Sequence, residues 1–99
     1  QQMNKLLFAL SLAKKSGKLV MGFDAVKTAV IHGTAHIVLL AEDLSEKTVK
    51  RVNYFCEDLT EVHNTGLTQF EISQVAGRLT GVLAVTDENL AVLARNALQ

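Results

Sequence analysis

The chain has 99 residues, a length that suits one compact domain, and 48% of them are hydrophobic, which is enough to build a buried core. Ten basic residues balance ten acidic residues, so the composition argues against a protein that binds nucleic acid through overall positive charge and leaves room only for a local basic patch. The single cysteine, Cys56, excludes a disulfide within these residues and fits a reducing compartment.

The first predicted helix covers residues 3–15. Met3, Leu6 and Leu10 recur at helical spacing, basic side chains occupy the last turn, and Ser16–Gly17 supplies a stop. No basic segment precedes this apolar stretch, so we expect a helix of a soluble, cytoplasmic protein and not a signal peptide. No apolar run reaches the roughly 18 residues that span a bilayer, so we expect no membrane contact. Since the chain begins with glutamine, we expect a few residues to be missing before it.

Four strands are predicted further along the chain. Residues 36–43 and 81–85 contain uninterrupted apolar runs with β-branched members, a pattern typical of strands buried on both faces. Residues 18–21 form a short apolar run, and residues 60–65 give a weaker strand pattern.

Four further helices are predicted at residues 23–33, 44–58, 68–78 and 86–98. Ser45 can cap the helix at 44–58, and either Thr86 or Asp87 can cap the last helix. The apolar spacing of the last two helices directs the following side chains toward the core: Phe70, Ile72, Val75 and Ala76, then Leu90, Leu93, Ala94 and Ala97.

The elements therefore follow the order αβαβαβαβα. Alternation with short connections predicts a sheet that is covered by helices on both faces, a three-layer α/β/α sandwich. No linker, internal repeat or low-complexity segment interrupts this pattern, so we expect residues 1–99 to form a single domain.

The sequence contains no recognisable catalytic or metal-binding motif. None of the serines lies in a G-x-S-x-G elbow, and Gly33 ends a helix between His32 and His36, so these histidines do not form an H-x-x-x-H pair. Cys56 falls on an apolar helix face with no neighbour in sequence that would lower its pKa, which predicts a packed thiol. We expect no enzyme activity, no cofactor, no metal and no small-molecule substrate.

Two polar segments have alternative interpretations. Glu42 and Asp43 follow a buried strand, where carboxylates can be catalytic or bind a metal. Because no partner carboxylates stand at a recognisable spacing, we expect both to face solvent and to help start the next helix. The segment at 77–81 carries Arg78 between two glycines and lacks the Lys–Ser/Thr end of a phosphate-binding loop. It is either a helix stop before a strand or a contact loop.

The segment that begins at Gly22 offers more chemistry. Glycine permits a tight turn and a close approach of a ligand, and the free N–H groups of the following helical turn attract phosphate. Lys14, Lys18 and Lys27 lie on either side of it in the sequence. From spacing alone, an ordinary capped helix is the favoured interpretation because Asp24 is itself anionic.

Two long segments resemble a known family. Residues 15–45, with G-F-D-A-V and A-E-D-x-S, and residues 70–91 resemble the kink-turn-binding ribosomal protein family, often called the L-seven-Ae family. Within it the chain is most similar to the small bacterial YlxQ-like members. The resemblance implies a mixed four-stranded sheet within the α/β/α sandwich. It also implies an RNA partner, in particular a kink-turn, a bent duplex with tandem sheared G·A pairs, and an association with translation that makes the ribosome a candidate partner.

The resemblance also implies where the RNA binds. Family members use the start of the second helix, with the motif G-x-N-E-x-x-K, and a loop before the last strand. Gly22 matches the glycine, whereas Asp24, Ala25 and Thr28 stand at the Asn, Glu and Lys positions. The residues implied are Gly22, Phe23, Asp24, Ala25, Lys27, Thr28, Arg78, Leu79 and Thr80, with Lys14 and Lys18 on the rim. The segments 22–28 and 77–80 should then lie side by side at one end of the sheet.

The sequence therefore predicts a non-enzymatic, ribosomal-protein-like protein that binds structured, kink-turn-like RNA. The alternative is a protein-interaction module that kept the fold and lost specific RNA recognition. The neutral charge favours this alternative, as does Ala25, whose side chain forms no hydrogen bond. The apolar pair Val20–Met21 also favours it, because basic residues often precede the glycine in the family.

Overall fold

The computed structural model describes residues 4–98, and the expectation for Met3 lies outside these residues. Within these residues five helices and four strands alternate, in the order predicted from the sequence. The helices are α1 (Lys5–Lys15), α2 (Phe23–Ile31), α3 (Glu46–Cys56), α4 (Gln69–Ala76) and α5 (Glu88–Ala97). The strands are β1 (Leu19–Met21), β2 (Ile37–Leu40), β3 (Val62–Asn64) and β4 (Val82–Val85).

The four strands form one mixed sheet in the order β1-β4-β2-β3. The central strand β4 runs antiparallel to both of its neighbours, while β3 runs parallel to β2 at the far edge. The register pairs Met21 of β1 with Leu83 of β4, and Leu39 of β2 with the same Leu83. The end of β1 therefore lies beside the start of β4.

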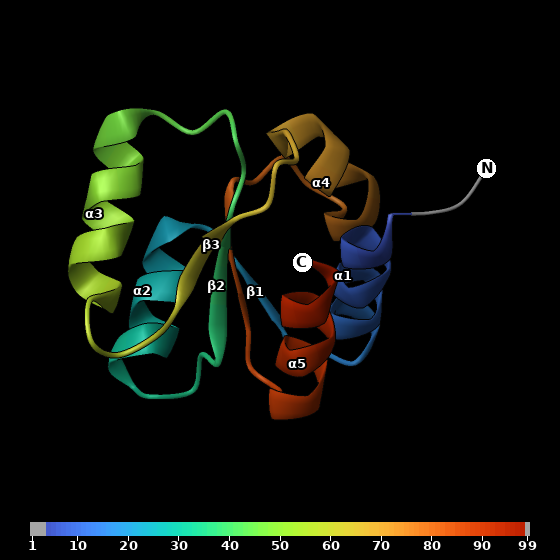
Figure 1. Ribbon diagram of the computed structural model, residues 1–99, viewed down its shortest axis with the longest axis horizontal. Coiled ribbons are helices and arrows are strands. Elements are labelled where there is room, and N and C mark those ends of the chain that lie inside the picture. Colours follow the sequence, from blue (N-terminus) through green and yellow to red (C-terminus); the bar gives the residue numbers. More distant parts are fainter. Residues whose placement is uncertain (1–3, 99) are drawn as a thin grey trace.

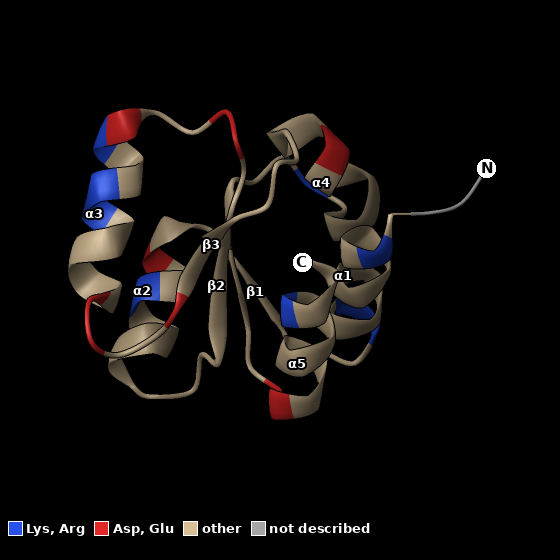
Figure 2. Cartoon of the chain, viewed as in Figure 1, with Lys and Arg blue, Asp and Glu red and all other residues tan. Residues whose placement is uncertain are grey.

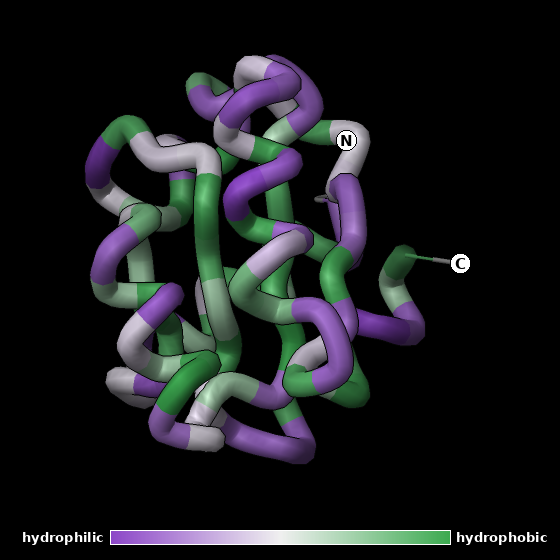
Figure 3. The backbone as a smooth tube through the Cα atoms, turned by 90° about the vertical axis from the view of Figure 1, so that its left-hand side faces the viewer, coloured by the Kyte–Doolittle hydropathy of each residue, from purple (hydrophilic) through white to green (hydrophobic). Residues whose placement is uncertain are grey.

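The helices cover both faces of the sheet, which confirms the predicted three-layer α/β/α sandwich. Figure 1 shows α2 and α3 on one side and α1, α4 and α5 on the other. All residues of β2 and β4 are buried, and successive side chains point to opposite layers. Ile37 and Leu39 join the core under α1, α4 and α5, whereas Val38 and Leu40 join the core under α2 and α3. Figure 3 shows the hydrophobic strands surrounded by more hydrophilic helices and connections.

Two apolar side chains that we expected in the core are exposed. Phe70 of α4 is 68% exposed, while Ile72 and Ala76 on the same helix are buried. Phe70 precedes Ile72 by two residues, which is about 200° around a helix, so both cannot face the sheet. Leu93 of α5 is likewise exposed, because α5 packs through the small residues Ala91 and Ala94. Small side chains here allow α5 to lie close to α1.

The predicted helix caps are largely confirmed. The Ser45 side chain accepts a hydrogen bond from the Thr48 N–H, and Asp87 does the same for Leu90. Asp43 is exposed, as expected. The expectation that it helps to start the next helix, α3, was wrong. Its Oδ1 accepts the N–H of Gln69 at 3.0 Å, so Asp43 helps to start α4 instead. This contact ties the connection after β2 to the helix that precedes β4.

A bidentate ion pair connects the edge strand β3 to the last helix. Glu61, immediately before β3, accepts hydrogen bonds at 2.7 to 3.0 Å from Nε and Nη2 of Arg95 on α5. Glu61 Oε1 also lies 2.6 Å from Nε2 of His63. The hydrogen bonds from Arg95, and secondarily those from His63, lower the pKa of the Glu61 carboxyl from 4.5 to about 2. The pair thus secures an edge strand of only three residues.

This pKa shift predicts a pH-dependent contribution to stability. The folded-state pKa of Glu61 lies below its ordinary value, so the pair stabilises the fold above about pH 4.5 and loses this effect progressively as the pH falls toward 2. Between about pH 4.5 and pH 2, the free energy of unfolding should therefore fall less in Arg95→Gln than in the wild type. Urea denaturation at several pH values measures the effect, with Lys5→Gln as a control for the change in charge. Equal pH slopes in the wild type and Arg95→Gln would contradict the prediction.

Candidate nucleic-acid interface

Gly22 forms the corner between β1 and α2. Its φ of 99° and ψ of 151° lie in a region that is essentially restricted to glycine. The Gly22 N–H donates to the Val82 carbonyl at 2.9 Å, and the Gly22 carbonyl accepts from Val26 N–H at 3.0 Å. The capped helix favoured from spacing was wrong, because no side chain among residues 4–98 caps the first turn of α2. A side chain caps the start of each of α1, α3, α4 and α5. Unsatisfied N–H groups at this end are suited to an anion.

Arg78 lies directly beside this corner. A Cβ atom added to Gly22 would stand 3.3 Å from Nη2 of Arg78, so the absence of a side chain at Gly22 leaves room for the guanidinium. Arg78 follows α4, and its loop leads into β4, whose first residue, Val82, bonds to Gly22. The segments 22–28 and 77–80 thus meet at one end of the sheet, as expected.

A second cation approaches the same loop from α1. Gly77 ends α4 in the left-handed conformation, with a φ of 80°, and a Cβ atom there would stand 3.3 Å from Nζ of Lys14. We call the area formed by the half-buried Gly22 and the exposed Lys14, Gly77, Arg78 and Leu79 the Gly22–Arg78 surface. Its cations come from two different helix ends on the same side of the molecule.

The other predicted site residues fall in different places. Asp24, Ala25, Lys27 and Thr28 are exposed on α2, and Leu79 is 67% exposed in the loop before β4. Thr80 is buried, and its hydroxyl lies 3.3 Å from the Val82 carbonyl, so its side chain adds nothing to the exposed surface.

The backbone of Lys18 lies against the end of α1, where its N–H donates to the Ala13 carbonyl at 2.8 Å, and not beside Gly22. Its carbonyl accepts the N–H of Thr86 at 2.9 Å, beyond the end of β4. The backbone of Lys18 is therefore at the opposite end of β1 from Gly22.

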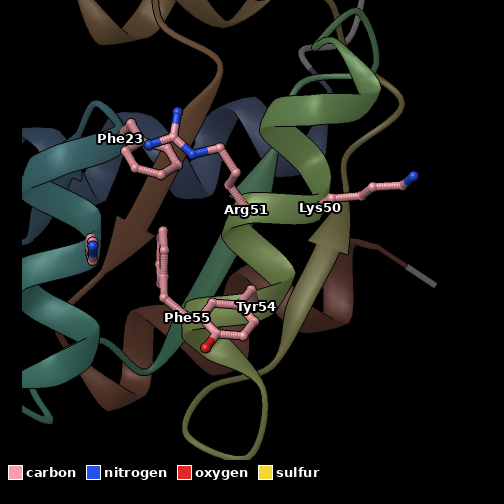
Figure 4. A pocket seen from close by; sticks show the side chains of 6 residues that line it. Phe23, Lys50, Arg51, Tyr54 and Phe55 are labelled. Carbon is pink, nitrogen blue, oxygen red and sulfur yellow. The ribbon is translucent and has the colours of Figure 1, made fainter.

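Phe23 lies on the side of α2 that faces α3. Its ring meets that of Phe55 edge to face, with centroids 5.3 Å apart, and the Arg51 guanidinium carbon lies 4.5 Å from the Phe23 centroid. Phe23 and Lys27 line a cavity of about 270 Å³ between the two helices. The other lining residues are Lys50, Arg51, Tyr54 and Phe55, and we call this cavity the α2–α3 hollow (Figure 4).

No motif in the sequence marks Arg51 or Tyr54 as a site residue. They stand three residues apart on α3, which places them on neighbouring turns of one face. The sequence alone shows an ordinary helix with basic and aromatic residues. Only the packing of α3 beside α2 brings these side chains next to Phe23.

Charge on this end of the molecule is mixed, as Figure 2 shows for the start of α2 and for the region around α4. Lys14 and Arg78 are balanced in part by the exposed Asp24.

Within residues 4–98, no cluster of three His, Cys, Asp or Glu side chains could hold a metal ion. Burial raises the pKa of the Cys56 thiol to about 11, so this buried cysteine stays protonated and unreactive, as predicted for a packed thiol. No helix of the described chain has the length and apolar character needed to cross a bilayer.

The fold is that of a known class of proteins. The chain belongs to the ribosomal protein L7Ae/L30e/S12e/Gadd45 family, whose model matches residues 4–94. A curated relative, the RNA-binding protein YlxQ of Bacillus subtilis, is 34% identical over 87 residues, which make up 83% of this chain and 83% of that protein.

Solved structures share the fold. A Bacillus halodurans protein described as having unknown function superposes with a TM-score of 0.91 at 23% identity, covering 97% of this chain and 98% of that one. The 15.5kD RNA binding protein of Giardia lamblia gives a TM-score of 0.77 at 17% identity, covering 95% of this chain and 82% of that one. The mixed four-stranded sheet implied by the family resemblance is thereby confirmed.

The Gly22 corner predicts a specific response to substitution. Gly22→Ala should lower the free energy of unfolding by about 1–3 kcal/mol, because alanine is strained at this backbone conformation and its Cβ would press on Arg78. Gly33→Ala is the matched control: Gly33 also has a positive φ, 76°, but nothing lies within 4 Å of an added Cβ. It should cost about 1 kcal/mol from backbone strain alone. Urea denaturation compares the two, and a smaller loss at Gly22 than at Gly33 would contradict the assignment.

Proposed function

We propose that this chain is a cytoplasmic RNA-binding protein that recognises structured, kink-turn-like RNA through the Gly22–Arg78 surface and acts in association with translation. The observation that carries the proposal is the position of the Arg78 guanidinium beside the uncapped start of α2. Family membership and the RNA-binding name of the Bacillus subtilis relative support RNA as the partner. The family's ribosomal members support the ribosome as the setting.

The surface offers two kinds of contact to a folded RNA. The free N–H groups at the start of α2 would receive a phosphate, and Lys14 and Arg78 would neutralise the adjoining backbone charges. Leu79 is 67% exposed at the tip of the loop, where its side chain can pack against a base that the kink has unstacked. Phosphate contacts would give affinity, and the loop would favour a bent RNA over a regular duplex.

Base recognition would be weaker than in family members with the full motif. An ionised Asp24 accepts hydrogen bonds from guanine amino or imino groups but donates none, and the Ala25 side chain does neither. Lys27 lies about 100° around the helix from Thr28, the position of the family lysine, and it lines the α2–α3 hollow instead. A direct base contact contributes roughly 1–3 kcal/mol of discrimination, so the loss of two would leave a less selective RNA binder.

The second candidate is a protein-interaction module on the same fold. The observation that favours it is the exposure of Phe70 and Leu79 on α4 and the following loop, 68% and 67% respectively. Together with the neutral net charge, exposed apolar side chains are compatible with a protein partner. Such a module would bind its partner without any RNA.

A salt-dependent titration separates the two candidates. The wild-type chain should bind a kink-turn RNA at low salt, and more weakly a matched duplex in which the G·A pairs are replaced by Watson–Crick pairs. Affinity for both should fall as salt increases, because phosphate contacts release counterions. Absence of binding to either RNA at low salt would refute the RNA function. Equal affinity for both would refute kink-turn specificity only.

Arg78 provides the sharpest test of the surface. Arg78→Ala should weaken RNA binding roughly tenfold, since a hydrogen bond to a charged group contributes about 1.5 kcal/mol or more. It should also reduce the slope of log affinity against log salt by about 1. The melting temperature should change by less than about 2 °C, because Arg78 is exposed. Lys5→Ala, at the start of α1, controls for the loss of one exposed charge. A large loss of stability in Arg78→Ala would mark this residue as structural.

A further inference from the structure

The α2–α3 hollow combines cationic and aromatic side chains, most of which are not part of the proposed RNA contact at the Gly22–Arg78 surface. Three of its six lining side chains are cationic, Lys27, Lys50 and Arg51, and three are aromatic, Phe23, Tyr54 and Phe55. Among residues 4–98, no carboxylate side chain lines it. In a chain whose charges balance overall, this is a local concentration of positive charge beside aromatic rings. Phosphate and a flat base together match such a lining.

Arg51 is held in place within the hollow. Its guanidinium carbon lies 4.5 Å from the centroid of Phe23, whose ring is supported edge-on by Phe55 at 81°. Figure 4 shows the Arg51 side chain extending from α3 toward Phe23, whereas Lys50 points away from it. A cation that already rests on an aromatic face loses little freedom when it binds an anion, because its position is fixed in advance.

Tyr54 presents a ring almost entirely to solvent. It is 81% exposed, more than the other large apolar side chains described as exposed. An aromatic ring this exposed contributes little of the hydrophobic stabilisation that a buried ring gives to a fold. Tyr54 stands one turn of α3 beyond Arg51, at the end of the hollow away from the start of α2. It is therefore placed to stack on a base whose phosphate lies near Arg51.

The hollow adjoins the Gly22–Arg78 surface. Phe23 directly follows Gly22, and Lys27 lies about 6 Å further along the axis of α2, little more than one turn. A strand that leaves the Gly22–Arg78 surface along α2 would pass the exposed Asp24 and then reach the hollow, whose six lining residues include no carboxylate. Nucleotides can bridge this distance, so one RNA molecule can occupy both places.

We propose that the α2–α3 hollow binds an unpaired nucleotide of the same RNA whose folded part lies on the Gly22–Arg78 surface, with Tyr54 stacked on the base and Lys27 and Arg51 on the adjoining phosphates. This inference rests on the proposed RNA-binding function and names a further part of its ligand: a single-stranded segment that flanks the folded element. The hollow then gives affinity with little dependence on sequence, because every base has a face that can stack.

The test compares two RNAs that differ only in a flanking single strand. One is the blunt-ended kink-turn RNA; the other carries four unpaired nucleotides, added in turn to the 5′ or the 3′ strand of the bound helix. The wild-type chain should bind one extended RNA at least roughly fivefold more tightly than the blunt RNA. Tyr54→Ala should abolish this advantage and leave the affinity for the blunt RNA unchanged. Phe8→Ala, which removes another exposed aromatic ring on the opposite helical layer, should keep the advantage.

A second variant tests the phosphate contact. Arg51→Gln should reduce the advantage of the extended RNA and lower its salt slope by about 0.7, the value for one phosphate of a single strand. Lys47→Gln is the matched control, since Lys47 is exposed on the same helix and does not line the hollow. An equal effect of both variants would overturn the assignment of Arg51.

The outcomes separate this inference from the function on which it rests. Tight binding of the blunt RNA with no gain from either extension would overturn the inference and leave the proposed function standing. No binding of any RNA would overturn both. A glutamate-rich peptide tests the other occupant of this lining. If it binds in a Tyr54-dependent manner while the extensions give no gain, the hollow belongs to an acidic protein partner and the nucleotide proposal is wrong.

Discussion

The antiparallel pairing of β4 with β1 and β2 is the constraint on which the rest of this structure depends. β4 lies in the middle of the sheet and is buried on both faces, so helices must cover both sides. Because β4 runs opposite to β1, the loop that enters β4 meets the corner that leaves β1, and Gly22 N–H bonds to Val82. The same pairing brings Arg78 to the start of α2. If β4 ran parallel to β1, the two segments would stand at opposite ends of the sheet.

Phe23 links the two parts of the proposed RNA interface. On one side it follows the Gly22 corner, where Arg78 and the free N–H groups of α2 gather. On the other side its ring supports Arg51 and packs on Phe55 in the α2–α3 hollow. A neutral chain can present local basic side chains in this way, although the exposed Asp24 lies on the same end of α2. The result is an interface whose affinity would come from few phosphate contacts and from stacking, with modest dependence on total charge.

Sequence reasoning succeeded where one physical rule decides the outcome. Uninterrupted apolar runs identified β2 and β4, since only a strand covered on both faces tolerates them. Ser45 was correctly predicted as a cap. The reasoning failed for Phe70 and Leu93, because short helices with scattered apolar residues allow more than one inward stripe. It also placed Asp43 at the wrong helix, since its partner Gln69 is distant in sequence and near only after folding.

The candidate site was also predicted only in part from the sequence. The glycine at position 22 and the family resemblance were both present in the sequence, because each depends on local residue order. The uncapped start of α2 was not predicted, since spacing alone favoured a capped helix. Tertiary structure decided the proximity of Arg78 to Gly22 and the burial of Thr80. It also decided the placement of Lys18 against the end of α1 and the grouping of Arg51 and Tyr54 with Phe23. Local order determines which conformations and charges a segment can offer. Which of them meet depends on strand direction and helix packing, which act between residues far apart in the chain.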